Sequence, residues 1–149
     1  MGLAIIGGRL AVLAVLLACP AVHAIEVDDL SGFEPHFGRY VPAGDCSRQP
    51  QVVVGLAGFS FEGGPALPNA TRPEYAASFM GNFYEGSSLF FFPYTAEPRP
   101  LLLTFNAGEK PGVLTIEGYD HDYPGGPTLP ERYRPYIAAS PYLRCATAR

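Results

Sequence analysis

The stretch LFFFPYTAEPRPLLLTFNAGEKPGVLTIEGY, residues 89–119, decides the fold of this chain. Leu89–Phe92 is a continuous apolar run of the kind found in strands that are buried on both faces. In residues 101–106 and 113–119, every second side chain shares a face of the extended chain, and each run presents an apolar face. Segments rich in proline and glycine separate the three runs. The stretch therefore predicts three consecutive strands that pair as an antiparallel meander.

Shorter patterns on both sides of this stretch predict further strands. Residues 38–41 and 51–54 are rich in aromatic and β-branched side chains, and residues 59–62 alternate between apolar and polar. A glycine-bounded turn joins the last two runs, so they are predicted to form a hairpin. Residues 141–145 are expected to be extended, whereas the mixed and acidic residues 25–37 are expected on the surface.

Two short helices are also expected. The sequence Thr-Arg-Pro-Glu from residue 71 has the spacing of a capping box, which predicts a helix over residues 71–80. A strand over residues 76–80 is the alternative. The sequence Thr-Leu-Pro-Glu from residue 128 repeats the capping arrangement, and Pro135 is expected to kink the helix that follows or divide it into two turns.

The composition fits one globular domain. The 149 residues include 17 Gly and 16 Pro, which are too many helix-breaking residues for a helical bundle or a coiled coil. Ten Phe and nine Tyr supply enough apolar surface to exclude general disorder. The predicted fold class is α+β and β-rich: a small antiparallel sheet or partly closed barrel of about six strands, with one or two short helices.

The amino-terminal residues have the pattern of a secretory signal peptide. A positive charge precedes the apolar run of residues 10–19, and Val22 and Ala24 are small enough for the positions that a signal peptidase reads. The run is too short to span a hydrocarbon core about 30 Å thick, so no transmembrane helix is expected. We expect residues 1–24 to be removed and residues 25–149 to form a single β-rich domain that is periplasmic or secreted.

Lipidation is the alternative route of processing. The sequence Leu-Leu-Ala-Cys at residues 16–19 resembles a bacterial lipobox, in which the cysteine becomes the lipidated first residue. Lipidation of Cys19 would make the protein a membrane-anchored lipoprotein.

Cleavage after residue 24 leaves two cysteines, Cys46 and Cys145. In an oxidising compartment such a pair predicts a disulfide, which would close a loop of about 100 residues. Two free thiols or a metal-binding pair are the alternatives. The sequence contains no Cys-x-x-Cys motif that would favour zinc.

The mature domain is modestly acidic. The chain has ten Lys+Arg and fourteen Asp+Glu, and the loss of Arg9 leaves nine against fourteen, a net charge of −5. Nucleic acid is not expected as a partner, because phosphate binding needs cationic side chains. An envelope protein or a small apolar ligand is the kind of partner expected.

Asp120, His121 and Asp122 form the one cluster that could bind a metal or support catalysis. An extended segment would point the two carboxylates away from the histidine, and His36 is the only other histidine of the mature domain. The favoured interpretation is a polar turn in which the aspartates accept hydrogen bonds from backbone amides. No catalytic residue, metal or cofactor is therefore expected.

Other catalytic patterns are weak. Ser60 lies in Gly-Phe-Ser-Phe-Glu, which lacks the final glycine of a nucleophile elbow. A glycosidase needs two carboxylates about 5–10 Å apart, and the sequence cannot pair any of its candidates, which are Glu62, Glu74, Glu85 and Glu117. Eight aromatic rings within residues 79–105 could line a pocket or present a patch to a partner, but a role in the core is favoured.

Four segments carry a resemblance: GRYVPAGDC at 38–46, LTFN at 103–106, PGVLTI at 111–116 and SPYLRC at 140–145. Together they resemble a group of small exported proteobacterial proteins of unassigned function. The resemblance implies a common fold and a bridge between Cys46 and Cys145, and it implies no activity.

These observations favour a non-enzymatic binding module of the periplasm or envelope, either an inhibitor of a secreted hydrolase or a carrier of a small apolar ligand. The alternative is a small hydrolase or metal-dependent enzyme built on the loop of residues 120–122. Convergence of His121, His36 and carboxylates would favour the enzyme. An apolar cavity or an exposed aromatic patch would favour binding.

Overall fold

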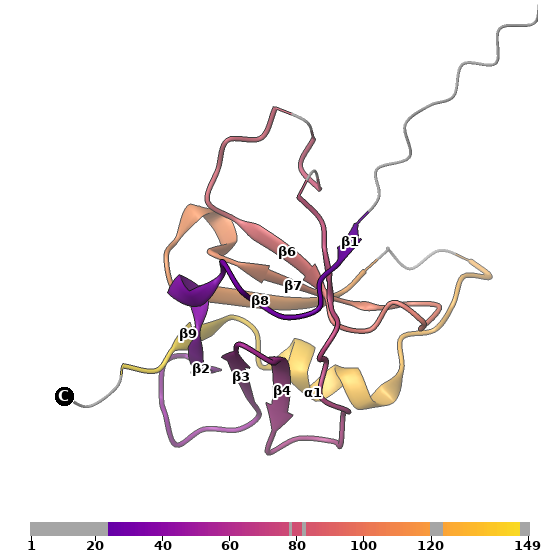
Figure 1. Ribbon diagram of the computed structural model, residues 1–149. Helices are drawn as coiled ribbons and strands as arrows, with labels where there is room; N and C mark the ends of the chain where they lie inside the picture. The colour runs from indigo at the N-terminus through magenta and orange to yellow at the C-terminus, as the bar shows by residue number, and fades with distance from the viewer. Residues whose placement is uncertain (1–23, 78, 82, 120–123, 147–149) are drawn as a thin grey trace, which may run out of the picture.

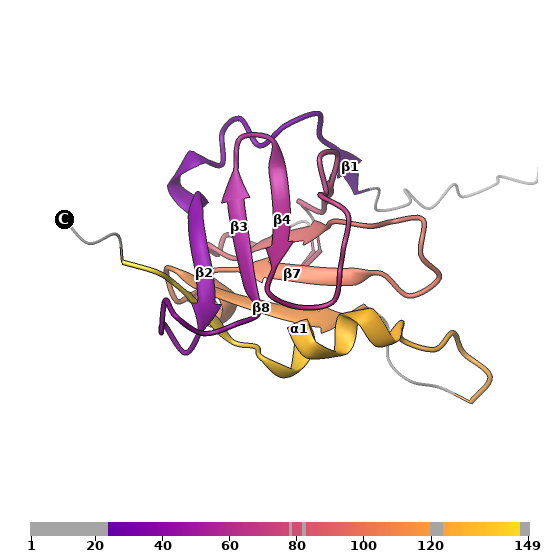
Figure 2. The same cartoon turned by 90° about the horizontal axis from the view of Figure 1, so that it is seen from below.

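The fold is one antiparallel sheet that curls into a half-barrel (Figure 1 and Figure 2). The computed structural model describes residues 24–77, 79–81, 83–119 and 124–146. Within these residues the sheet has nine strands in the order β1-β5-β6-β7-β8-β9-β2-β3-β4. The strands are β1 (Ile25–Glu26), β2 (Gly38–Pro42), β3 (Gln51–Gly55), β4 (Gly58–Glu62), β5 (Glu74–Tyr75), β6 (Leu89–Phe92), β7 (Leu101–Phe105), β8 (Val113–Gly118) and β9 (Tyr142–Arg144). The helical elements are the short 3₁₀ helices η1 (Glu34–His36), η2 (Ala107–Glu109) and η3 (Glu131–Tyr133) and the α-helix α1 (Arg134–Ala138).

The predicted meander is formed by β6, β7 and β8. Leu103 on β7 lies opposite Phe91 on one side and Ile116 on the other, and all three belong to the inner core. Phe90 and Phe92 alternate with Phe91 and belong to a second cluster on the outer face. β6 is therefore buried on both faces, as its continuous apolar run predicts.

The carboxy-terminal strand joins the meander to the rest of the sheet. β3 and β4 form the predicted hairpin, and β2 pairs with β3. β9 lies between β2 and β8, with Leu143 opposite both Val41 and Val113. The predicted extended tail is thus confirmed for Tyr142–Arg144, which completes one continuous sheet.

The segment between β4 and β6 brings the two ends of the strand order together. Ala70 exchanges two backbone hydrogen bonds with Phe59 on β4, at 2.9 and 3.0 Å. Farther along the same segment, Tyr75 on β5 pairs with Phe91 on β6. Residues 70–75 therefore link β4 to β6 and bridge the open side of the half-barrel.

The helix predicted over residues 71–80 is wrong, and so is the alternative strand over residues 76–80. Glu74–Tyr75 forms the short strand β5, and the described residues between it and β6 belong to no helix or strand. Tyr75 packs on the inner core, whereas Ala76 lies in the outer cluster. This alternation of faces is that of an extended chain, so tertiary packing overrides the capping-box spacing.

A helical segment near the carboxy terminus lies beside β8 and covers one end of the sheet (Figure 2). η3 runs directly into α1, so the segment changes from a 3₁₀ turn to an α-helical turn at Arg134 and is not interrupted at Pro135 as predicted. Pro135 lies in the first turn of α1, where the missing N–H removes no helical hydrogen bond. The expected cap at Thr128 is wrong, because Pro130 occupies the N-cap position of η3 and no side chain caps it. Among the described residues, no helix has the length and apolar character needed to cross a bilayer.

Aromatic side chains fill the space that the curled sheet encloses. The rings of Phe59, Phe91 and Phe105 lie 5.4 to 5.9 Å apart between centroids. Tyr136 on α1 and Tyr142 on β9 are fully buried, and the Tyr142 hydroxyl donates to the Tyr136 carbonyl oxygen at 2.8 Å. Most of the rings singled out in the sequence are therefore used in packing.

Residues 25–37 are only partly on the surface, contrary to expectation. Leu30 is buried in the inner core, and its backbone N–H donates to the Leu56 carbonyl oxygen at 2.9 Å. The ring of Phe33 lies 5.0 Å from that of Phe91. This amino-terminal segment thus buries Leu30 in the core and packs Val27, Phe33 and Phe37 against it, despite its acidic composition.

Candidate binding surface

A second apolar cluster lies on the outer face of β6 and β7. Phe90, Phe92 and Leu102 alternate with inner-core residues along these strands, so they project from the opposite face. Each is at most 7% exposed, because the loop that follows β5 packs over them. Within that loop, the ring of Phe79 lies 4.8 Å from Phe90. The outer face of the sheet is therefore apolar as well as the inner face.

Large side chains in the loop after β5 and just after β8 are exposed to solvent. Phe83 is 96% exposed, Met80 is 61% exposed and Tyr119 is 43% exposed. The Tyr119 ring also lies 5.0 Å from Phe92 and 5.9 Å from Phe79, so the exposed and buried rings form one surface. We call this surface the outer aromatic patch; it consists of Phe79, Met80, Phe83, Phe90, Phe92 and Tyr119.

The loop that carries the patch is held by one glutamate. The Glu109 carboxylate accepts hydrogen bonds from the Tyr84 hydroxyl, the Ser87 backbone N–H at 2.5 Å, the Ser87 hydroxyl at 2.8 Å and the Ser88 hydroxyl at 3.2 Å. The bond from Tyr84, followed by those from Ser87, lowers the pKa of Glu109 to about 2. Glu109 is therefore ionised at neutral pH and fastens this loop to the β7–β8 connection.

The backbone of the β7–β8 connection aims Glu109 at its partners. Asn106, Gly108 and Glu109 adopt left-handed φ angles of 50°, 62° and 62°. Such angles are uncommon for residues other than glycine. The Asn106 side chain supports the turn, because its amide group donates to the Ser87 carbonyl oxygen at 3.0 Å and its oxygen accepts from the Gly112 N–H at 3.1 Å.

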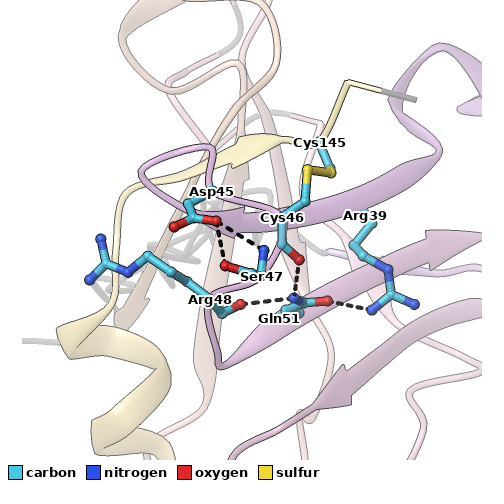
Figure 3. Close-up of a disulfide and its surroundings, with 7 residues drawn as sticks. All are labelled: Arg39, Asp45, Cys46, Ser47, Arg48, Gln51 and Cys145. Atoms are coloured by element: carbon cyan, nitrogen blue, oxygen red, sulfur yellow. Dashed lines mark hydrogen bonds between the residues drawn. A yellow bond between two sulfur atoms is a disulfide. The ribbon is translucent and has the colours of Figure 1, made fainter. Parts of the chain in front are cut away.

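The predicted disulfide between Cys46 and Cys145 is present, with the two Cα atoms 5.7 Å apart (Figure 3). It joins the β2–β3 loop to the end of β9. Beneath that loop, the buried Gln51 side chain donates to the carbonyl oxygens of Cys46 at 3.0 Å and Arg48 at 2.8 Å. Arg39 donates to the Gln51 side-chain oxygen at 2.5 Å. These polar groups satisfy one another, so the cluster fixes the loop that carries the bridge.

Several predicted sites lie outside the described residues. They are Cys19 and the three residues Asp120, His121 and Asp122. In the described part of the chain, no group of three His, Cys, Asp or Glu side chains is arranged to hold a metal ion.

His36 is distant from the strand end that leads to residues 120–122. Its ring lies 5.9 Å from that of Phe105, at one end of β7. Gly118 lies opposite Leu101, at the other end of β7, about 13 Å away along the strand. Burial first, and the charge of Arg144 second, lower the pKa of His36, so its ring is neutral at pH 7.

The candidate glutamates are distributed over separate parts of the sheet. Glu62 on β4 forms an ion pair with Arg39 at 2.5 Å. Glu74 on β5 and Glu117 on β8 are separated by β6 and β7, which places them about 14 Å apart at the usual strand spacing. Glu85 is exposed in the loop before β6. The separation of Glu74 and Glu117 exceeds the 5–10 Å that paired-carboxylate glycoside cleavage requires.

Sequence reasoning found the ring-rich stretch but not the arrangement of its members. The run of Phe90, Phe91 and Phe92 predicts a strand with two apolar faces, but it does not show which rings lie on the outer face. The exposure of Phe83 depends on a loop conformation that no local pattern specifies. Glu109 was also missed, because its partners lie 21 to 25 residues away in the sequence.

The chain matches no protein-family model, no curated protein sequence and no solved structure. The geometry of the outer aromatic patch is accordingly the basis on which a function is proposed.

Proposed function

We propose that this chain is an exported, non-enzymatic binding module that contacts its partner through the outer aromatic patch. The observation that carries the proposal is the exposure of Phe83 and Met80, at 96% and 61%, in the same loop whose Phe79 ring packs on Phe90. Contiguous exposed apolar surface is typical of interaction sites on soluble proteins, and aromatic side chains supply much of the binding energy at such sites.

The order of the loop supports this proposal. Four hydrogen bonds to Glu109 hold Tyr84, Ser87 and Ser88, so the end of the loop that follows Phe83 is tied to the β7–β8 connection before a partner arrives. Preorganisation of this kind lowers the entropy lost on binding. A ring as exposed as Phe83, in a loop anchored at its next residue, is better suited to recognition than to packing within the chain.

The packing of the inner core supports an outer site over an interior one. The rings of Phe59, Phe91 and Phe105 are in mutual contact within the curled sheet, and Tyr40 adds a further ring 5.4 Å from Phe105. A ligand carried in the interior would have to displace these side chains from a close-packed core. Recognition on the outer face requires no such rearrangement.

Two features support export. The bridge between Cys46 and Cys145 fits an oxidising compartment, where disulfides persist. β1 begins at Ile25, the residue that follows the expected cleavage site. A chain processed after Ala24 would therefore keep every strand that lies within the described residues.

Photo-crosslinking in producing cells tests the proposal. The full chain is expressed with p-benzoylphenylalanine at position 83, and a matched chain carries it at position 56. Leu56 is a suitable control because it is also apolar and 54% exposed, but lies in the β3–β4 turn. We expect a crosslinked adduct of defined mass from position 83 and not from position 56. Equal labelling at the two positions, or no adduct from position 83, would refute the proposal.

A further inference from the structure

Carboxylates border the outer aromatic patch on two sides. Glu74 lies opposite Phe92 in the β5–β6 pair, and Glu117 lies opposite Leu102 in the β7–β8 pair. Residues directly opposite each other in an antiparallel pair share a face of the sheet. The two glutamates therefore stand on the outer face, on either side of the apolar row formed by Phe92 and Leu102.

The glutamates beside the patch have few cationic neighbours. Glu26 on β1 lies opposite Glu74. Arg72 forms ion pairs with Glu26 at 2.6 Å and with Asp28 at 3.3 Å. Among the described residues, neither Glu74 nor Glu117 forms an ion pair. Glu85 adds a further exposed carboxylate in the loop that carries the patch.

Four arginines of the described chain lie away from the patch. Arg39 and Arg144 lie on β2 and β9, which pair with each other on another part of the sheet. Arg132 and Arg134 belong to η3 and α1. Arg72 and Arg99 lie closer, Arg72 in its pairs with Glu26 and Asp28 and Arg99 beside Gly118. Glu74 and Glu117 are the carboxylates that face the apolar row of β6 and β7 directly.

Resting on the proposed function, we propose that the partner is a protein segment whose apolar side chains are flanked by lysine or arginine. Such a segment would place its apolar side chains against Phe83 and Met80 and its cations beside Glu74 and Glu117. Complementary charge at the rim of an interface speeds association and selects against wrong partners.

The same charges disfavour the other possible occupants. A bilayer rich in anionic lipid would bring negative headgroups towards Glu74 and Glu117, which repel them. A second copy bound through the same patch would oppose one acidic rim to another, because a twofold interface pairs identical surfaces. Of these occupants, a basic segment is the one that the carboxylates of Glu74 and Glu117 attract.

Fluorescence anisotropy with two defined peptides tests this inference. The probes are labelled Lys-Lys-Leu-Phe-Ile-Leu-Lys-Lys and its counterpart with glutamate at each lysine position, each mixed with the protein purified after export. We expect the lysine peptide to bind about tenfold or more tightly than the glutamate peptide at low salt, and the difference to shrink as salt screens the charges.

Three variants separate the apolar and charged contributions. Phe83→Ser should weaken the binding of both peptides, and the exposure of this ring predicts that folding is unaffected. The double variant Glu74→Gln/Glu117→Gln should weaken only the lysine peptide, by about two- to fivefold for each carboxylate. Glu131→Gln, an exposed carboxylate in η3, is the matched control and should change neither affinity.

Equal affinity for the two peptides, or no binding of either, would overturn the inference. Two further experiments test the other occupants. Binding to vesicles of phosphatidylethanolamine and phosphatidylglycerol, or dimerisation in analytical ultracentrifugation, would also overturn the inference if it depended on Phe83. If position 83 still forms a crosslink while the peptides show no preference for lysine, the charge inference fails and the proposed function stands. If position 83 forms no crosslink, the proposed function itself fails.

Discussion

Replacing Cys46 or Cys145 with alanine is expected to lower the free energy of unfolding by about 2–5 kcal/mol. The bridge spans a sequence separation of 99 residues. In the chain-entropy model, a loop of about this length constrains the unfolded chain by about 4.7 kcal/mol at 25 °C. For a domain with a typical stability of about 5–15 kcal/mol, this is a large part of the total.

The structure explains why the loss should not exceed this range. Without the bridge, β9 still pairs with both β2 and β8, and the Cys145 backbone N–H donates to the Arg39 carbonyl oxygen at 2.7 Å. Tyr142 remains anchored by burial and by its hydrogen bond to Tyr136. We therefore expect a folded but weakened domain in which the contacts of the tail are kept.

Urea unfolding of the wild type, the two single variants and the double variant measures the effect. With m of about 2 kcal/mol/M, the midpoint should fall by about 1–2.5 M in each variant. The double variant should be no less stable than either single variant, because all three remove the same bond. A double-variant loss equal to the sum of the two single losses would refute the bridge as the cause. Two reactive thiols in the denatured, unreduced wild type would refute it as well.

Three further predictions concern the loop that Glu109 holds, the loop of residues 120–122 and the cleavage of the amino-terminal segment. Glu109→Gln should release the loop before β6 and speed its cleavage in limited proteolysis at pH 7. An unchanged cleavage rate would show that the Glu109 carboxylate does not hold this loop. Because hydrogen bonds lower the pKa of Glu109 from 4.5 to about 2, its contribution to stability is present above pH 4.5 and lost as the pH falls towards 2, which unfolding curves of wild type and variant across that window would show. His121→Ala should leave the unfolding midpoint and the metal content unchanged, and stoichiometric zinc or copper that only the wild type retains would show that the loop binds metal. Intact-mass measurement of the exported protein should give a chain that begins at Ile25, whereas the mass of a diacylated Cys19 would indicate a lipoprotein.

The meander could be predicted because its pattern is local. Leu101, Leu103 and Phe105 repeat at the period of a strand, and prolines and glycines mark both ends of the run. The structure buries these three residues in the inner core, as the period requires. The disulfide was predictable from a count of cysteines, since the cleavage expected after residue 24 would leave two to pair.

The two shortest strands could not be predicted in the same way. β1 and β5 contain two residues each, too few for any period to appear. The spacing of Thr71 and Glu74 suggested a helix cap, but Glu74 instead pairs opposite Glu26 and Phe92. Their extended conformation depends on strands that are distant in sequence, and local propensity is a weak guide in such a case.

The candidate surface was predictable in composition and not in geometry. The sequence shows many rings within residues 79–105, but the register of β6 decides that Phe91 points inwards and Phe90 outwards. The loop before β6 is in turn held at Tyr84 and Ser87 by hydrogen bonds to Glu109, which cross between two loops. Contacts of this kind become visible only once the sheet is assembled.

The position dependence of photo-crosslinking tests the role of the outer aromatic patch most directly. p-Benzoylphenylalanine is placed in turn at Met80, Phe83 and Tyr119 in the patch, and at Leu56 and Leu143, which are exposed elsewhere on the domain. We predict that the three patch positions give the same adduct and that the two control positions give none. Adducts from the control positions at equal yield, or no adduct from any patch position, would contradict a binding function for this surface.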